Sequence, residues 1–361
     1  MAKTTKKGKS LTEAVSLELN SGFDLSKFKK EKGLVSNTKF KEQKWLPLSQ
    51  AFQDLLSIEG IPLGQITLLR GHTDTGKTTS LLEAAVSCQK NNILPVLIIT
   101  EMKWNWEHTI QMGLQVQVGK GEDGEIENLT GNFIYVDRET LHCVEDVAAF
   151  ILDLLDEQKK GNLPYDLMFL WDSVGSIPCE LSIKSNKNNN EWNASAMATQ
   201  FGNSVNQQIM LSRKESSPYL NTLVCVNKVW TQKPENPMGK PKLMNKGGFA
   251  MWFDAGLVIT YGNILTSGTS KINAIKGGKK VEFAKRTNIQ IDKNHINSTA
   301  TRGTLVMTAH GFIPNTDKAI KAYKDEHKDE WGQKLGGLDF KLVEEEEEEG
   351  NAMIGFNNEP E

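Results

Sequence analysis

Eight consecutive residues carry the strongest chemical signal in this chain. Residues 71–78 read Gly-His-Thr-Asp-Thr-Gly-Lys-Thr, which is the G-x-x-x-x-G-K-T spacing of a phosphate-binding loop. The glycines let backbone N–H groups surround phosphate oxygens, and a helix N-terminus behind the loop adds its positive dipole end. We expect Lys77 to reach the β- and γ-phosphates and the Thr78 hydroxyl to complete a Mg²⁺ coordination sphere. The pattern therefore predicts a nucleoside triphosphate site.

The flanking residues favour this interpretation over a chance glycine turn. A β-prone run at 65–70 precedes the loop, and residues 79–90 carry apolar side chains at helical spacing. Farther along, Trp106 and His108 are candidates to pack against an adenine face, although a core or surface position is an equal alternative for each. The predicted nucleotide-binding residues are Gly71, His72, Thr73, Asp74, Thr75, Gly76, Lys77, Thr78, Thr79, Trp106 and His108.

Two carboxylates that follow apolar runs are candidates for a hydrolytic centre. Asp172 ends the run 167–171, and at the tip of a core strand beside the phosphate loop it would bind Mg²⁺ together with Thr78. Glu101 follows the run 96–100, where a carboxylate can orient the water that attacks the phosphate. The alternative for Asp172 is a turn or a helix cap, and the alternative for Glu101 is a helix cap or a surface position.

Apolar, β-prone runs alternate with helical patterns through the middle of the chain. The runs fall at 65–70, 95–100, 133–136, 167–171, 222–226 and 256–261, and the helical patterns at 46–58, 79–90, 104–114, 141–158 and 194–213. Apolar strands separated by helices predict an α/β fold with a mostly parallel central sheet covered on both faces. Three later segments, at 271–276, 279–292 and 303–308, predict antiparallel strands that extend this sheet.

Charge is concentrated at the two ends of the 361-residue chain, although its net charge is only −3. Residues 1–44 hold 11 Lys and five acids, a balance of +6, and residues 339–361 hold nine acids and one Lys, a balance of −8. Such blocks commonly form solvated tails. The alternative is a basic arm that contacts nucleic acid or a neighbouring subunit, with an acidic tail that competes for the same basic surface.

The composition favours a reducing compartment. The four cysteines are scattered without a C-x-x-C pair, which argues against disulfides and a structural metal. No apolar run approaches the ~20 residues of a membrane span, and no signal peptide opens the chain. We therefore expect a cytoplasmic protein without membrane partners.

Two polar segments suggest contact with nucleic acid. Residues 228–246 hold five Lys, one Glu, three prolines and Trp230, directly after a predicted core strand. A long basic loop with an aromatic residue suits phosphate contact and base stacking. The segment 182–193 is a candidate companion loop, since long loops in compact domains are either functional or disordered. The basic and aromatic candidates are Trp230, Lys233, Lys240, Lys242 and Lys246.

In their order and spacing these motifs resemble the RecA-type strand-exchange recombinases, most closely the shorter phage recombinases of the UvsX kind. The match runs from about Leu46 to Pro314. It comprises the phosphate loop at 71–78, Glu101 at the position of the family's catalytic glutamate, Asp172-Ser173 at the Mg²⁺-associated strand end, the strand 221–227 that leads into the second DNA-binding loop, and Gly247-Gly248-Phe249-Ala250 at the exit from that loop.

The resemblance implies a RecA-like ATPase core that uses ATP and Mg²⁺ and assembles as a helical filament on single-stranded DNA. Double-stranded DNA, single-strand-binding proteins and loader proteins are further implied partners, and a phage-encoded member would act in the host cytoplasm. Segments 182–193 and 228–246 would line the DNA axis, with Gly247 and Gly248 among the DNA-binding residues.

Three residues bear on how closely the family's mechanism applies. Lys293 and His295 fall where the family carries a basic pair that acts on the neighbouring subunit's triphosphate, and they complete the implied catalytic set. His295 replaces one basic residue and is only fractionally charged near neutral pH. Lys228 stands where bacterial members carry a glutamine that is thought to sense the γ-phosphate, so we expect the coupling between nucleotide and DNA to differ here.

These observations predict four parts of the chain. They are a basic N-terminal arm or oligomerisation segment at 1–45, a RecA-like ATPase core at 46–315, a short helical region at 316–340 and an acidic disordered tail at 341–361. Two alternatives are a hexameric DNA helicase motor and a DNA scaffold that binds ATP without hydrolysing it. Such helicases carry a sizeable domain before the motor, whereas only about 60 residues precede the first strand here. The full set of Lys77, Thr78, Glu101 and Asp172 argues against the scaffold.

Overall fold

The computed structural model describes residues 24–33, 39–120, 126–187, 189–232, 241–263 and 268–330. The chain divides into two units, Met1–Phe40 and Lys41–Glu361. The acidic tail predicted at 341–361 and the candidate DNA-binding residues Lys233 and Lys240 lie outside the described residues. So do residues 1–23 and 34–38 of the predicted basic arm and residues 331–340 of the predicted helical region.

The first unit contains one short helix among its described residues. Helix α1 (Leu25–Glu31) begins after Asp24, whose side chain accepts a hydrogen bond of 2.9 Å from the Lys27 N–H. This contact satisfies one of the backbone donors that a helix N-terminus leaves unpaired. The helix places lysines in its last turn, which suits the negative end of its dipole.

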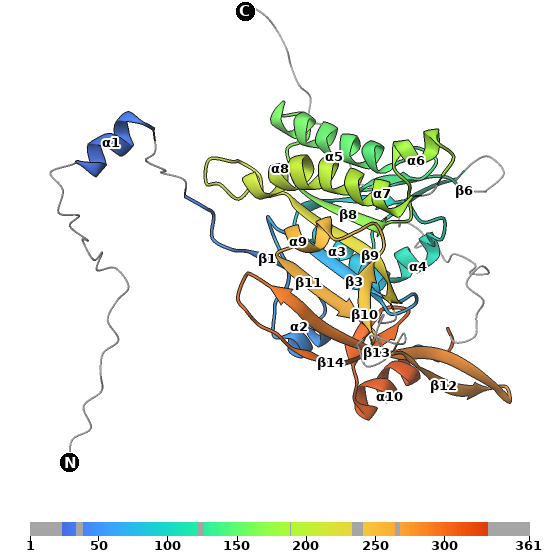
Figure 1. The fold of residues 1–361 in the computed structure, drawn as a ribbon. Helices are drawn as coiled ribbons and strands as arrows, with labels where there is room; N and C mark the ends of the chain where they lie inside the picture. Colours follow the sequence, from blue (N-terminus) through green and yellow to red (C-terminus); the bar gives the residue numbers. More distant parts are fainter. Residues whose placement is uncertain are drawn as a thin grey trace, which may run out of the picture. The chain divides into compact units, whose positions relative to one another are not determined.

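The second unit is built on one large sheet (Figure 1). Its path of neighbouring strands runs β15 (Gly311–Pro314), β14 (Arg302–Thr308), β13 (Lys279–Asn294), β11 (Leu257–Tyr261), β3 (Ile66–Gly71), β9 (Thr222–Gln232), β8 (Asp166–Val174), β4 (Ile93–Ile99) and β7 (Ile134–Asp137). The strands from β11 to β7 pair in parallel, and those on the β13 side pair antiparallel. The predicted α/β fold, with a mostly parallel sheet and antiparallel extension strands, is confirmed.

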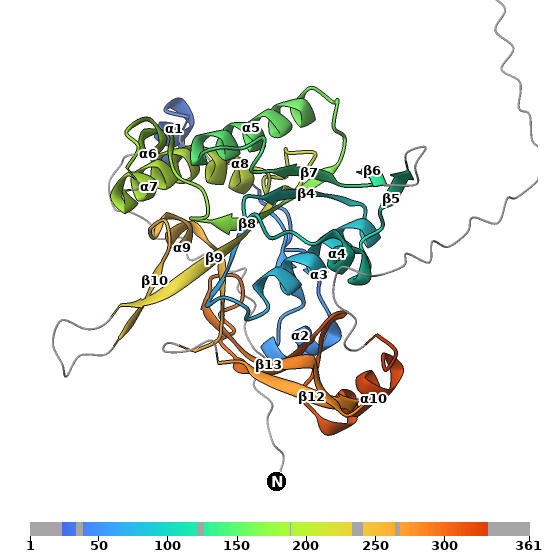
Figure 2. The ribbon, with the colours of Figure 1, turned by 90° about the vertical axis from the view of Figure 1, so that its right-hand side faces the viewer.

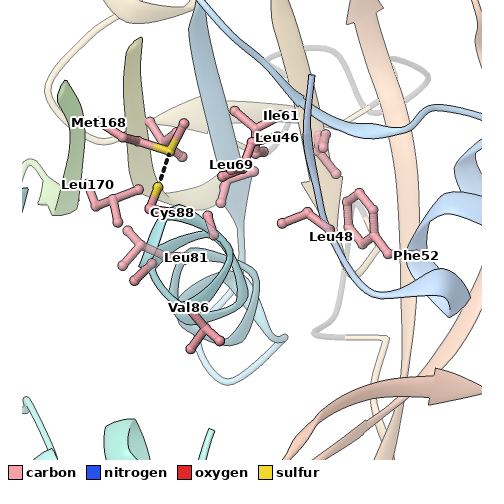
Figure 3. Close-up of a cluster of buried hydrophobic side chains, with 14 of the residues drawn as sticks. Leu46, Leu48, Phe52, Ile61, Leu69, Leu81, Val86, Cys88, Met168 and Leu170 are labelled. Atoms are coloured by element: carbon pink, nitrogen blue, oxygen red, sulfur yellow. Dashed lines mark hydrogen bonds between the residues drawn. The ribbon is translucent and has the colours of Figure 1, made fainter. Parts of the chain in front are cut away.

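One hydrophobic core joins the sheet to α3 (Lys77–Lys90) and α2 (Gln50–Leu56) (Figure 3). In this core Cys88 of α3 contacts Met168 of β8, with 3.4 Å between the two sulfur atoms. Phe52 of α2 belongs to the same cluster and is fully buried. The phosphate loop therefore leads into a helix that is fixed along its length by packing against the sheet.

A second hydrophobic core contains the strand side chains on the opposite face of the sheet. It packs them against α5 (Val144–Lys159), the π-helical segment η1 (Ala198–Val205) and α8 (Asn206–Leu211), and Figures 1 and 2 show α5 and α8 on the same side of the sheet. Trp171 of β8 stacks on Phe201 of η1 with 5.0 Å between ring centroids. Burial on both faces explains why the parallel strands are apolar throughout instead of alternating.

Two predicted helices differ from the structure. The helix predicted at 46–58 begins instead as a strand, because β1 (Trp45–Pro47) pairs with β2 (Gly60–Pro62) and only α2 is helical in that segment. Leu46 faces the core and pairs with Ile61, so tertiary pairing overrides the helical pattern there. The helix predicted at 194–213 is divided into the end of α7 (Asn190–Met197), η1 and α8.

The two segments predicted as loops contain regular structure. Segment 182–193 includes the end of α6 (Glu180–Lys184) and the start of α7, which Asn189 caps by accepting a 2.8 Å hydrogen bond from the Glu191 N–H. In segment 228–246 the described residues form the two arms of a hairpin, in which β9 pairs antiparallel with β10 (Lys242–Asn245). Figure 2 shows these arms running outward past the helix α9 (Ala250–Asp254). The remaining elements are α4 (Trp106–Gln111), β5 (Gln117–Lys120), β6 (Ile126–Thr130), β12 (Ser270–Lys276) and α10 (Asp317–Glu326).

Candidate nucleotide-binding site

The phosphate loop leaves the carboxyl end of β3 and enters α3 through Gly76. This glycine has a φ of +99°, and a Cβ added to it would lie 2.8 Å from the Phe312 ring. Backbone conformation and crowding therefore both require glycine at this position. The loop residues that line the adjoining cavity are Asp74, Thr75, Gly76, Lys77, Thr78 and Thr79, while Gly71, His72 and Thr73 form the entry from β3.

The Lys77 side chain is buried and folds back into the loop. Its Nζ donates a 2.5 Å hydrogen bond to the His72 carbonyl oxygen and lies 3.5 Å from Thr75 Oγ1. Burial lowers the pKa of Lys77 to about 8, against the opposing influence of Asp172 and Glu101. A desolvated ammonium group that is held by one carbonyl is suited to exchange that partner for a phosphate oxygen.

Asp172 and Thr78 meet beside Lys77. The Thr78 hydroxyl donates a 2.6 Å hydrogen bond to Asp172 Oδ2, and burial raises the pKa of Asp172 to about 6. A buried carboxylate next to a hydroxyl offers the oxygen ligands that Mg²⁺ prefers, and the cation would favour the ionised form of the acid. The residues present therefore fit the metal site predicted from the sequence.

Glu101 lies two residues after the end of β4, and two side chains contact the same oxygen of its carboxylate. Glu101 Oε1 accepts a 2.5 Å hydrogen bond from Ser173 Oγ and lies 2.8 Å from Lys228 Nζ. Burial alone would raise the pKa of Glu101, but the contacts with Lys228 and Ser173 hold this pKa below its usual value. The carboxylate is thus charged and oriented.

The sheet topology explains why these residues converge. Strands β3, β9, β8 and β4 are consecutive parallel neighbours, so their carboxyl ends lie along one edge. In the register of the sheet, Gly71 pairs with Lys228, and Asp172 pairs with Ile99, two residues before Glu101. The sequence places Lys228 in the basic segment 228–246 and at a position that departs from a family pattern, but it does not predict the contact with Glu101. The sequence signal for Lys228 was its position two residues after the apolar run 222–226, although the strand order that brings it to Glu101 is not visible in the sequence.

A cavity of about 510 Å³ extends from the phosphate loop between α4 and the β13–β14 pair. His108 lines it, whereas Trp106 packs on Tyr135 with 4.9 Å between ring centroids and is not among the lining residues. Burial and the neighbouring His310 lower the pKa of His108. The other lining residues outside the loop are Asn105, Glu282, Phe283, Ala284, Lys285, Met307, Thr308 and Ala309. Lys285 also forms an ion pair with Asp74, which fixes the rim of the loop.

A second, polar cavity of about 380 Å³ lies where the α6–α7 region meets the end of β10. Arg138, Lys187 and Lys246 contribute its basic groups, and Asn186, Asn190 and Asn193 contribute amides. The α7 helix and the chain after β10 approach closely, because a Cβ on Gly248 would lie 2.7 Å from the Ala194 Cβ. Basic and amide groups around a concave polar surface suit a phosphodiester backbone.

The other predicted DNA-binding residues lie around this hairpin. Trp230 on β9 is 51 % exposed, a high value for tryptophan on a strand. Lys242 on β10 is also exposed, and Gly247 and Gly248 follow β10 with φ values of +80° and +89°. These positive φ values favour glycine at the point where the chain turns toward α9.

The predicted trans-acting residues, Lys293 and His295, do not line the nucleotide cavity of their own chain. Lys293 Nζ donates to the carbonyl oxygens of Trp252 and Phe253 at the end of α9, at 2.9 and 2.8 Å. Burial lowers the pKa of Lys293, and the nearby Asp254 opposes that shift. The backbone N–H of His295 donates a 2.9 Å hydrogen bond to the Gly256 carbonyl oxygen.

Comparison with known proteins does not assign the chain to a family. No protein-family model matches it, and no curated protein matches it. Among the described residues, no helix has both the length and the apolar character needed to cross a membrane.

Proposed function

We propose that this protein is a DNA-dependent ATPase of the RecA-type recombinase class, which assembles on single-stranded DNA in the presence of ATP. The observation that carries the proposal is the convergence of Lys77, Thr78, Asp172 and Glu101 at one edge of a parallel sheet. A fold-level resemblance alone would not argue function, but these four groups have the chemical roles that phosphoanhydride hydrolysis requires.

Each side chain has a distinct part in the proposed reaction. Lys77 stabilises the negative charge that develops on the β- and γ-phosphates, and Glu101 orients the attacking water and accepts its proton. A bound Mg²⁺ supplies charge neutralisation at the phosphate oxygens, and Thr78 and Asp172 are the residues that would hold it. His108 and the cavity beside it provide space for the nucleoside.

The polar cavity and the β9–β10 hairpin support nucleic acid as the partner. β9 carries Lys228 beside the nucleotide site and Trp230 on an exposed surface, so one strand spans both regions. We propose that DNA contacts the hairpin and the surface near Arg138, Lys187 and Lys246. Filament assembly, strand exchange, and action of Lys293 and His295 on a neighbouring subunit are the further parts of this proposal.

Electron microscopy and a hydrolysis assay test the proposed function together. With ATP, Mg²⁺ and single-stranded DNA we expect open helical filaments and a hydrolysis rate that DNA stimulates. Closed rings would favour the helicase motor. Binding of ATP without turnover, with or without DNA, would favour the non-hydrolysing scaffold.

The charge of Lys228 is expected to restrain hydrolysis in the absence of DNA. Replacing Lys228 with methionine removes the ion pair with Glu101 and leaves a side chain of similar length. Because the pair is partly exposed, it stabilises the charged form of Glu101 by only about 1 kcal/mol. We therefore expect its removal to raise the DNA-independent hydrolysis rate roughly fivefold. Steady-state hydrolysis without DNA measures this. Lys242→Met, on the opposite arm of the hairpin, is the control, and an unchanged or lower rate in Lys228→Met would contradict the expectation.

The polar cavity is expected to contribute to phosphate contacts. Replacing Lys187 and Lys246 together with alanine should reduce the log–log salt slope of single-stranded DNA binding by roughly 1.4, because each contact contributes about 0.7. Fluorescence anisotropy at several salt concentrations measures the slope. The control is the double alanine variant of Lys159 and Lys160, which are exposed at the far end of α5. An equal slope in wild type and the cavity variant would place the DNA elsewhere.

A further inference from the structure

Two histidines and a glutamate form a cluster outside the nucleotide site, where α10 meets the turn between β14 and β15. His310 lies in that turn, His327 ends α10, and Glu330 follows three residues later. His310 Nε2 lies 3.3 Å from Glu330 Oε2, and His327 Nδ1 lies 3.1 Å from Glu330 Oε1. The three side chains offer ligand atoms that all lie within 4.8 Å of one another.

The second nitrogen of each imidazole faces an oxygen atom. His310 Nδ1 lies 3.0 Å from the Tyr323 hydroxyl, and His327 Nε2 lies 4.0 Å from Glu326 Oε2. A histidine that binds a metal commonly has its other nitrogen held by an oxygen, as His310 Nδ1 is held by Tyr323, and this fixes the tautomer and the ring orientation. The separation between His327 and Glu326 is too long for a hydrogen bond. The two rings are also stacked, with 4.0 Å between their centroids, so the cluster is ordered by its own packing.

Glu330 is held as well. Gln111 Nε2, at the end of α4, donates a 3.2 Å hydrogen bond to Glu330 Oε2. The cluster therefore joins three separate parts of the fold, namely α4, the β14–β15 turn and the end of α10. A carboxylate that is already oriented toward two imidazoles needs little rearrangement to share a cation with them.

We propose that His310, His327 and Glu330 bind a divalent transition metal of the Zn²⁺ class and so fasten α10 to the core. Two imidazoles and one carboxylate suit Zn²⁺, whereas Mg²⁺ prefers oxygen ligands alone. Three protein ligands leave a fourth position of the tetrahedral sphere for water. This site shares no residue with the proposed ATPase centre and departs from the expectation that the chain lacks a structural metal.

The position of α10 gives the metal a structural role. Figures 1 and 2 both place this helix beside β12 and β13, where Ile320 packs against the small cluster of Ile272, Ala284 and Val306. A ten-residue helix is marginal without tertiary contacts, so an added link at its C-terminal end would hold it in place. Thr308 and Ala309, which directly precede His310, line the nucleotide cavity, and the metal would therefore also steady that rim.

Calorimetric titration of the full chain with Zn²⁺, in excess Mg²⁺ and without nucleotide, tests the proposal. We expect one Zn²⁺ per chain with a dissociation constant of about 1 μM or tighter. His327→Ala and Glu330→Gln should each weaken binding by at least ~100-fold, and Tyr323→Phe, which removes only the hydroxyl beside His310, by about tenfold. His142→Ala, at an exposed histidine before α5, is the matched control and should bind like wild type.

A second measurement keeps the test independent of folding defects. Co²⁺ in place of Zn²⁺ should give visible absorption bands of a tetrahedral site in the wild type, and His327→Ala should lack them while its far-ultraviolet circular dichroism is unchanged. Absence of stoichiometric Zn²⁺ binding by the wild type would overturn the proposal. Binding of Zn²⁺ with wild-type affinity by both the His310→Ala and the His327→Ala variant would also overturn the proposal.

Discussion

Replacing Lys77 with alanine should lower the rate of ATP hydrolysis by roughly 10²–10³-fold, the loss typical for one charged or polar group aimed at developing negative charge. In the structure the Lys77 ammonium is buried and its close partner is the His72 carbonyl oxygen, so a phosphate can take that partner's place. Because the Lys77 side chain is buried, its interaction with the triphosphate is stronger than it would be on the surface. Steady-state hydrolysis with saturating DNA is the measurement.

The pH dependence of ATP binding gives a second readout for the same residue. Because burial lowers the pKa of Lys77 to about 8, the ammonium form predominates below that pH and is lost above it. Wild-type affinity for ATP should therefore fall as the pH rises above 8, and Lys77→Ala should bind weakly without this fall. Hydrolysis within about threefold of wild type in Lys77→Ala would contradict the assigned role.

Loss of the fold would not explain a defect in Lys77→Ala. Burial lowers the pKa of Lys77 because it disfavours the charged ammonium form. Below pH 8 the buried side chain is charged, and its burial then opposes folding. Alanine removes this unfavourable burial and is the best helix former at the start of α3. Lys90→Ala, at the exposed end of the same helix, controls for an effect of substitution in α3.

The parallel core could be predicted from the sequence because its strands are buried on both faces. Uninterrupted apolar runs such as 167–171 and 222–226 identified β8 and β9, although β9 continues to Gln232 as one arm of the hairpin. Strands of three or four residues, such as β1 and β15, are too short for a periodic pattern, and their pairing depends on distant partners. Segment 182–193 looked like a loop because its Ser, Asn and Lys residues are typical of turns, yet the Asn189 cap begins a helix there.

The candidate site was predictable where its residues are close in sequence or follow a strand. Lys77 and Thr78 belong to one motif, and Asp172 and Glu101 each follow an apolar run. The ion pair between Lys228 and Glu101 could not be predicted, since the two residues are brought together by the order of β4, β8 and β9 in the sheet. The same reasoning applies to the His310 cluster, whose members meet only because α10 folds back beside the β14–β15 turn.

The substitution Glu101→Gln should separate nucleotide binding from hydrolysis. Glutamine has the shape of glutamate and keeps an oxygen that can accept from Ser173, but it cannot take a proton from water. We expect hydrolysis to fall by roughly 10²–10⁴-fold, the usual contribution of a general base, with ATP affinity within about threefold of wild type. Equilibrium binding of a fluorescent ATP analogue, together with single-turnover hydrolysis, measures the two effects separately.

A matched acid after the neighbouring strand provides the control. Glu139 follows β7 as Glu101 follows β4, but it is exposed and lies next to Asp137 instead of Lys228. Glu139→Gln should hydrolyse ATP like wild type. Under the proposed function, Glu101→Gln should also remain on single-stranded DNA long after ATP is added, because the bound triphosphate persists. Wild-type turnover in Glu101→Gln would show that Glu101 has no catalytic role. Slow turnover together with rapid release from DNA would show that ATP hydrolysis does not control release from single-stranded DNA.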